Sequence, residues 1–416
     1  MSKMSNHKFF LSHLSNPTHH QAHHANRCLV KKPFSLLGVL AVSLALTACN
    51  KGINPVEHEP SKLVSLAQNP TVLQPIANFK LGGGNAKDPL DLQPVIQANH
   101  VFVASRDGQV KSYPLASDAH AWSIKLKTPI TSGITADATG QTLVVTHKDG
   151  SVTALNAQNG AVKWQRQLSG TVLAPALIAN ARVLLMANDG NLYGLNLHTG
   201  EQVWRFNTST PAMSVRGAAS PILLTDNLAL FAGADGRMYG LTVDAGLPQW
   251  SYRVGIALGA SAIERMTDID ATPVVDNNQL FVVSHGGQLV GFDLTQQRIL
   301  WQQDTASLKR LAITDTAVIA TDLTGKVLAF HRKTGEPLWQ NESLMYRQLT
   351  NPVVINHLGQ SLIAVGDFEG YVHMLDAQTG DIVSRIRGQG SLTHLNVMDN
   401  RLVTQSIQGD VQLWQW

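Results

Sequence analysis

The sequence predicts an all-β fold, an eight-bladed β-propeller, and three observations carry this prediction. A turn glycine recurs at intervals of 38 to 51 residues, at Gly108, Gly150, Gly190, Gly236, Gly287, Gly325, Gly370 and Gly409. A tryptophan follows 14 residues after each of the first six, at Trp122, Trp164, Trp204, Trp250, Trp301 and Trp339. The eighth copy ends at Trp416 before it can form an outer strand. A period of about 40 to 50 residues with four short strands per repeat is typical of a propeller.

The clearest copy shows why each repeat should form strands. It begins with the apolar run 183–187 and turns at an Asn-Asp-Gly sequence that ends at Gly190. Alternating residues follow at 192–197, and a second turn at Gly200 leads to a strand that contains Trp204. Glycine supplies the positive φ angles that tight hairpin turns require. One tryptophan per repeat at constant spacing indicates architecture, with each ring filling the wedge between neighbouring blades.

The N-terminal residues 1–48 are predicted to be a signal peptide. Two lysines precede the apolar run 34–46, whose 13 residues match a signal h-region and are too few to span a bilayer. The sequence Leu-Thr-Ala-Cys that ends at Cys49 resembles the lipobox of bacterial lipoproteins. The resemblance implies that Cys49 becomes the first mature residue and carries lipid, and that Asn50 directs the protein to the outer membrane. A buried core helix is the alternative.

Residues 49–74 are predicted to be a lipidated, flexible tether, because they are polar and contain several prolines. The propeller is then assigned to residues 75–416. The stretch Ile76–Leu81 resembles the tryptophan-bearing strand of the other copies. We expect it to complete the last blade, because closing the ring in this way removes an exposed sheet edge.

Charge and cysteine content exclude several functions. Residues 1–48 hold five basic residues and no acidic one, so their removal leaves 27 basic against 29 acidic residues, and no nucleic-acid partner is expected. The cysteines are Cys28, in the leader, and Cys49. The mature domain therefore lacks a cysteine for a disulfide or a zinc site. The sequence contains no nucleophile elbow, P-loop or zinc-protease motif. We therefore expect a non-enzymatic protein without metal or cofactor, apart from the lipid.

The two longest intervals between turn glycines adjoin each other, and long loops on a rigid scaffold commonly carry function. The first loop contains Met-Ser-Val-Arg-Gly at 213–217, and the second contains Asp-Ile-Asp-Ala-Thr-Pro-Val-Val at 268–275. Together with the lipobox and the eight repeats, these segments resemble the BamB-type lipoproteins of the outer-membrane β-barrel assembly (BAM) machinery.

The resemblance implies a scaffold lipoprotein, anchored on the periplasmic face of the outer membrane, that docks onto the POTRA region of BamA. It further implies that the protein assists insertion of outer-membrane proteins, whose unfolded chains are additional partners. Its partner-binding residues would be Met213, Val215, Arg216, Asp268 and Asp270. An alternative is that Arg216 pairs with either aspartate within one propeller, as surface charges often do with little energetic effect.

Arg347 lies on the next such connection and is a further candidate for the partner-binding surface. Because its motif is short, we expect a solvated arginine instead.

Two other functions remain open. The pattern Ala-x-x-Gly-x-x-x-Trp at 157–164 resembles the tryptophan-docking propellers of quinoprotein alcohol dehydrogenases. That resemblance implies pyrroloquinoline quinone (PQQ) held over calcium and covered by a disulfide of adjacent cysteines, a pair that this chain lacks. A PQQ-dependent oxidoreductase is the alternative function, and a propeller that binds peptide or sugar in its central channel is a third.

Overall fold

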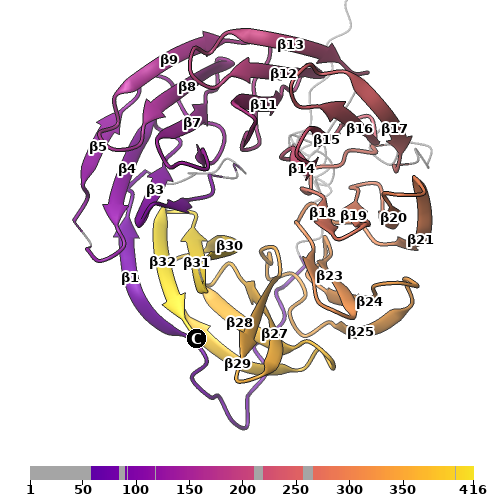
Figure 1. Cartoon of the computed structure of the whole chain (residues 1–416). Helices are drawn as coiled ribbons and strands as arrows, with labels where there is room; N and C mark the ends of the chain where they lie inside the picture. Colours follow the sequence, from indigo (N-terminus) through magenta and orange to yellow (C-terminus); the bar gives the residue numbers. More distant parts are fainter. Residues whose placement is uncertain are drawn as a thin grey trace, which may run out of the picture. The chain divides into compact units, whose positions relative to one another are not determined.

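The computed structural model describes residues 58–83, 90, 92–117, 119–209, 219–255, 266–398 and 400–416. Every regular element in these residues is a β-strand, and the strands form eight four-stranded antiparallel sheets (Figure 1). The prediction of an all-β, eight-bladed propeller is therefore confirmed. The described part of the chain holds no helix with the length and hydropathy needed to cross a membrane.

Each of blades 1 to 7 uses four consecutive strands in chain order from the inner to the outer strand. Blade 1 comprises β2 (Val95–Gln97), β3 (His100–Ala104), β4 (Gln109–Pro114) and β5 (Trp122–Lys125). Blade 2 comprises β6 (Thr135–Ala136), β7 (Thr142–Thr146), β8 (Ser151–Asn156) and β9 (Val162–Gln167). Blade 3 comprises β10 (Leu177–Ala179), β11 (Arg182–Met186), β12 (Asn191–Asn196) and β13 (Gln202–Asn207). Blade 4 comprises β14 (Ile222–Thr225), β15 (Leu228–Ala232), β16 (Arg237–Thr242) and β17 (Pro248–Arg253).

The second half of the chain continues the pattern. Blade 5 comprises β18 (Val274–Asp276), β19 (Gln279–Val283), β20 (Gln288–Asp293) and β21 (Arg298–Asp304). Blade 6 comprises β22 (Ala312–Ile313), β23 (Ala317–Thr321), β24 (Val327–His331) and β25 (Pro337–Asn341). Blade 7 comprises β26 (Val353–His357), β27 (Gln360–Gly366), β28 (Tyr371–Asp376) and β29 (Ile382–Arg387). Blade 8 comprises β30 (Leu392–Met398), β31 (Arg401–Ser406), β32 (Asp410–Gln415) and, as its outer strand, β1 (Gln74–Lys80).

Strand β1 closes the ring, as the sequence predicts. It pairs antiparallel with β32, and its residue Phe79 lies opposite Val411 (Figure 1). Phe79 is fully buried and packs, together with Leu81, against Val101 of blade 1. One strand from the N-terminus therefore completes blade 8 and also seals it against blade 1.

The tryptophans join successive blades. The Trp164 indole Nε1 donates a hydrogen bond of 2.8 Å to the carbonyl oxygen of Leu197 on the next blade. A Cβ atom on Gly200, in the same turn as Leu197, would lie only 2.5 Å from the Trp164 ring. The same arrangement recurs for Trp122 with Gly160, Trp204 with Gly246, Trp301 with Gly335 and Trp339 with Gly380. The regular spacing thus reflects packing between blades.

Antiparallel strand order puts two kinds of loop on one face of the propeller. The turn between the second and third strands of each blade lies on the same face as the connection that leads to the next blade. Backbone hydrogen bonds link the two kinds of loop, as from Asn188 N to Thr171 O at 2.9 Å. We call this side of the propeller the connection face.

Residues 58–73 do not form the free tether that the sequence predicts for 49–74. Ser61 N donates to Met345 O at 3.0 Å, and Val72 and Leu73 are buried in a cluster with residues of blades 7 and 8. Residues 58–73 are therefore bound to the propeller, because their backbone forms hydrogen bonds with it and their apolar side chains are buried against it. Residues 49–57 and the predicted signal peptide 1–48 lie outside the described residues.

Candidate interaction surface

The connection between blades 4 and 5 carries the second of the two candidate segments. Its backbone is fixed by both blades on the connection face: Ile269 N donates to Gly233 O of blade 4 at 3.4 Å, and His285 N of blade 5 donates to Asp268 O at 2.9 Å. A Cβ atom on Gly255 would lie 2.6 Å from Thr267 O, so the chain passes through a narrow space here. The segment is therefore rigidly placed, which a specific interaction surface needs.

Two carboxyl groups project from this fixed segment. Asp268 is fully buried and Asp270 is partly buried. Burial, and then the negative charge of Asp268, raise the pKa of Asp270 to about 7. The Oδ2 atom of Asp270 accepts no hydrogen bond from any residue that the structure describes. A cation near Asp270 would offset both the burial of its carboxyl group and the repulsion from Asp268.

The described chain resumes next to the second candidate segment. Met213, Val215 and Arg216 fall within 210–218, outside the described residues. Just after this gap, Ser220 N donates to the Thr272 hydroxyl at 3.1 Å. Ala219 and Ile269 also belong to one hydrophobic cluster. The structure thus brings together Asp268 and Asp270, and places Ala219 and Ser220 beside their segment.

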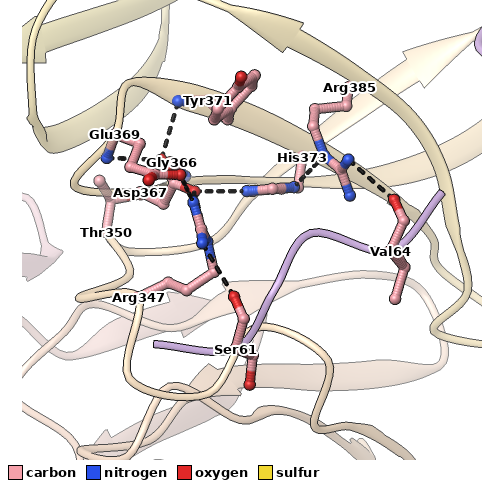
Figure 2. Close-up of polar contacts among 10 residues, drawn as sticks. All are labelled: Ser61, Val64, Arg347, Thr350, Gly366, Asp367, Glu369, Tyr371, His373 and Arg385. Carbon is pink, nitrogen blue, oxygen red and sulfur yellow. Dashed lines mark hydrogen bonds and ion pairs between the residues drawn. The ribbon is translucent and has the colours of Figure 1, made fainter. Parts of the chain in front are cut away.

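Arg347 differs from its prediction. Its side chain is only 3% exposed, so the expectation of a solvated arginine is wrong. Its Nε donates to Asp367 Oδ2 at 2.8 Å and its Nη1 to the Ser61 carbonyl at 3.0 Å, while Nη2 pairs with Glu369 (Figure 2). The guanidinium therefore links the β25–β26 connection, the β27–β28 turn and the N-terminal segment.

A buried histidine extends this cluster. His373 Nε2 lies 2.9 Å from Asp367 Oδ2, and Arg385 Nε donates to His373 Nδ1 at 3.0 Å (Figure 2). Burial lowers the pKa of His373. Because Nδ1 accepts a hydrogen bond from Arg385, Nε2 is the ring nitrogen that donates to Asp367. Burial alone would raise the pKa of Asp367, but hydrogen bonds from His373, the Tyr371 backbone and Arg347 lower it overall. Asp367 is therefore a stable anion that holds the cluster together.

A cavity of about 490 Å³ lies among the inner strands of blades 5 to 8. At one end Arg332 forms an ion pair with Asp276 and lies 5.7 Å over the Phe281 ring. Among the described residues, no group of three or more histidine, cysteine, aspartate or glutamate side chains is placed to hold a metal ion. Arg332 is thus already paired within the chain.

Eight four-stranded blades, with a tryptophan at most of the seams between them and an N-terminal strand that closes the ring, define a PQQ-like β-propeller protein. The family model described as "Outer membrane protein assembly factor BamB" matches residues 106–341 and 324–415. The chain belongs to the BamB family.

Individual relatives agree with this assignment. The BamB protein of Yersinia pestis is 29% identical over 392 residues, covering 90% of this chain and 97% of its own length. The crystal structure of BamB from Moraxella catarrhalis covers 83% of this chain and all of its own, with 40% identity and a TM-score of 0.77. A quinohemoprotein alcohol dehydrogenase from Comamonas testosteroni covers 83% of this chain and 76% of its own, with a TM-score of 0.65 but 11% identity. That last likeness shows the fold alone.

Proposed function

We propose that this protein is a non-enzymatic scaffold of the outer-membrane β-barrel assembly machinery that docks onto the POTRA region of BamA. Membership of the BamB family, matched from residue 106 to 415, is the observation that carries the proposal. The protein needs no cofactor for this role besides the lipid on Cys49. In the assembled machinery it helps outer-membrane proteins to insert, and their unfolded chains are further partners.

The docking surface is the pair of adjoining connections on the connection face. Asp268 and Asp270 supply carboxyl groups on a backbone that two blades hold. Arg216 supplies a cation, and Met213 and Val215 supply apolar contact. Arginine next to apolar side chains is typical of the residues that dominate binding energy at interfaces. A rigid acidic pair beside a flanking arginine can recognise a partner surface of mixed charge.

The docking proposal is tested with the soluble chain 58–416 and the purified POTRA region of BamA. Arg216→Ala and Asp268→Asn should each weaken binding by about 2–5 kcal/mol, the usual effect of removing one member of a desolvated charged pair. Lys148→Ala is the control, because Lys148 is exposed on the connection face of blade 2. Calorimetry gives the affinity, and the thermal midpoint shows whether each variant folds. Unchanged affinity for folded Arg216→Ala would move the docking site elsewhere.

The anchor is tested at Cys49. We propose that its thiol carries the lipid that holds the protein on the periplasmic face of the outer membrane. Cys49→Ser should abolish labelling by radioactive palmitate and leave an unprocessed precursor on a denaturing gel. Palmitate incorporation into the Cys49→Ser protein would disprove the anchor, whatever the outcome of the BamA experiment.

A further inference from the structure

The seventh repeat has lost the tryptophan that its predecessors carry. Ser384 of β29 stands at that position and pairs with Met374 across the blade, whereas Trp204 pairs with Gly194. The Ser384 hydroxyl donates to the Pro70 carbonyl at 2.6 Å. A segment from the N-terminus of the chain therefore occupies the place of the missing ring.

We call residues 58–73 the strap. Its last two residues, Val72 and Leu73, are buried against Leu362 of blade 7, Leu395 of blade 8 and Trp414 of β32. At five other seams one tryptophan ring fills the wedge between two blades, whereas here two aliphatic side chains from a distant segment do so. The strap is thus a structural part of the seam between blades 7 and 8.

Blade 7 and the connection that precedes it hold the rest of the strap through both its backbone and its side chains. The Asn69 side chain mimics strand pairing with β29: its Oδ1 accepts from Arg385 N at 2.7 Å, and its Nδ2 donates to Arg385 O at 3.0 Å. The Arg385 Nη1 donates to the Val64 carbonyl at 3.1 Å, and Arg347 reaches the Ser61 carbonyl (Figure 2). His58 stacks on Tyr346, with ring centroids 4.4 Å apart. The chain is therefore held from His58 onward.

We propose that the strap sets the reach of the lipid-anchored propeller from the membrane, a proposal that rests on the lipid anchor at Cys49. With the strap docked, nine residue steps separate Cys49 from His58, a span of about 30 Å when fully extended. With the strap released, 25 steps separate Cys49 from Gln74, the start of β1, and the span becomes about 85 Å. Docking of the strap therefore shortens the longest possible distance between Cys49 and the propeller almost threefold.

Docking also fixes the face on which the start of the strap lies. Ser61 is bound at Met345, in the connection between blades 6 and 7, and that connection lies on the connection face. The segment with Asp268 and Asp270 lies on the same face. The start of the strap thus lies on the side of the propeller that carries the proposed docking surface, and the proposed lipid on Cys49 binds a membrane surface within about 30 Å of His58.

The test uses the chain 49–416 with a maleimide lipid coupled to Cys49, the single cysteine in that range. Neutron reflectometry on a supported bilayer of phosphatidylethanolamine and phosphatidylglycerol measures the spacing between propeller and headgroups. Hydrogen exchange of the amides from 61 to 69 reports strap docking. The release variant combines Asn69→Ala with Arg385→Met, and Arg387→Met is the control, since Arg387 lies on the same strand with its guanidinium over Tyr371.

For the wild type and the control we expect protected strap amides and a spacing of no more than about 30 Å. In the release variant, strap amides should exchange at least tenfold faster and the spacing should increase or broaden by tens of ångströms. Inserting 12 Gly/Ser residues after residue 57 should lengthen the spacing without altering strap exchange, even if the release variant is unstable. Wild-type strap amides that exchange like an unstructured chain, or spacing unchanged by the insertion, would overturn the proposal.

BamA is absent from this experiment and the lipid is attached chemically. The reach proposal can therefore fail while docking to BamA and lipid attachment in cells both hold, and the converse is also true.

Discussion

At the scale of single residues, two acids on the connection face, Asp367 and Asp270, have pKa values that shift in opposite directions. The pKa of Asp367 is lowered because hydrogen bonds from His373, the Tyr371 backbone and Arg347 outweigh its burial. The pKa of Asp270 is raised to about 7 because burial and Asp268 act together. Asp367 therefore stabilises the folded chain as an anion, whereas ionised Asp270 opposes folding until a cation approaches.

This difference predicts how stability depends on pH. The folded state holds the proton of Asp270 more tightly than the unfolded state, so stability falls as pH rises from about 4 to 7 and then levels off. Asp270→Asn removes this loss and should be more stable than the wild type at pH 8, by as much as about 4 kcal/mol. At pH 4 the two proteins should differ little. Urea denaturation across this pH range measures the free energy of unfolding of both proteins. If the two plots of this free energy against pH are parallel, the pKa of Asp270 is not raised by folding.

The sequence could identify some of these residues and not others. Asp268 and Asp270 lie in one of the two longest intervals between turn glycines, so the spacing of those glycines identifies their loop. The burial of Arg347 could not, because it depends on Ser61, 286 residues earlier in the chain. In the sequence of blade 7, the serine at position 384, where earlier repeats have tryptophan, was the sign that this blade differs. It does not reveal which segment takes the place of the tryptophan ring.

At the scale of elements, each tryptophan needs two small neighbours. Trp204 lies against Gly194 on its own blade and against Gly246 on the next, where added Cβ atoms would approach the ring to 2.2 and 2.4 Å. In blade 5 the corresponding turn position is Gln297, with a φ of 50°, so that turn keeps its positive φ without a glycine.

Two glycine substitutions separate packing from backbone strain. Gly246 and Gly359 both have positive φ angles, of 64° and 80°, but only Gly246 faces a ring, and a Cβ on Gly359 meets nothing within 4 Å. Gly359→Ala should cost about 1 kcal/mol, from strain alone. Gly246→Ala should cost several times more, since the ring must also move and cores tolerate added atoms poorly. If chemical denaturation shows the same loss of unfolding free energy for both variants, the blades can move apart to accept the added Cβ atom at no cost.

At the scale of the whole molecule, ring closure was predictable because the last repeat lacks one strand and the N-terminus supplies a matching one. The strap was not, because its polar, proline-containing sequence has the composition of a linker. Its ordering arises from the seam between blades 7 and 8, which only the assembled ring creates.

Removal of β1 tests closure directly. Deleting residues 75–82 should strongly lower the thermal midpoint, because β32 loses its partner strand and the Phe79 cluster is opened to water. Replacing the exposed Ile76 alone with serine, as a control, should change the midpoint little. A deletion protein that melts like the wild type would mean that blade 8 is stable with three strands.

The pairing of β1 with β32 also has a consequence in time. Lys80 lies opposite Asp410, so 330 residues must be made after the first strand before its partner exists. Blades 1 to 7 pair strands that follow one another in the sequence, whereas β1 must meet a strand at the other end of the chain. Such a contact forms slowly, because a very large loop has to close before the pairing stabilises it. Until then β1 is an extended segment with unpaired backbone. The folding chain therefore passes through a state, open at one seam, in which its first strand is free to pair wrongly.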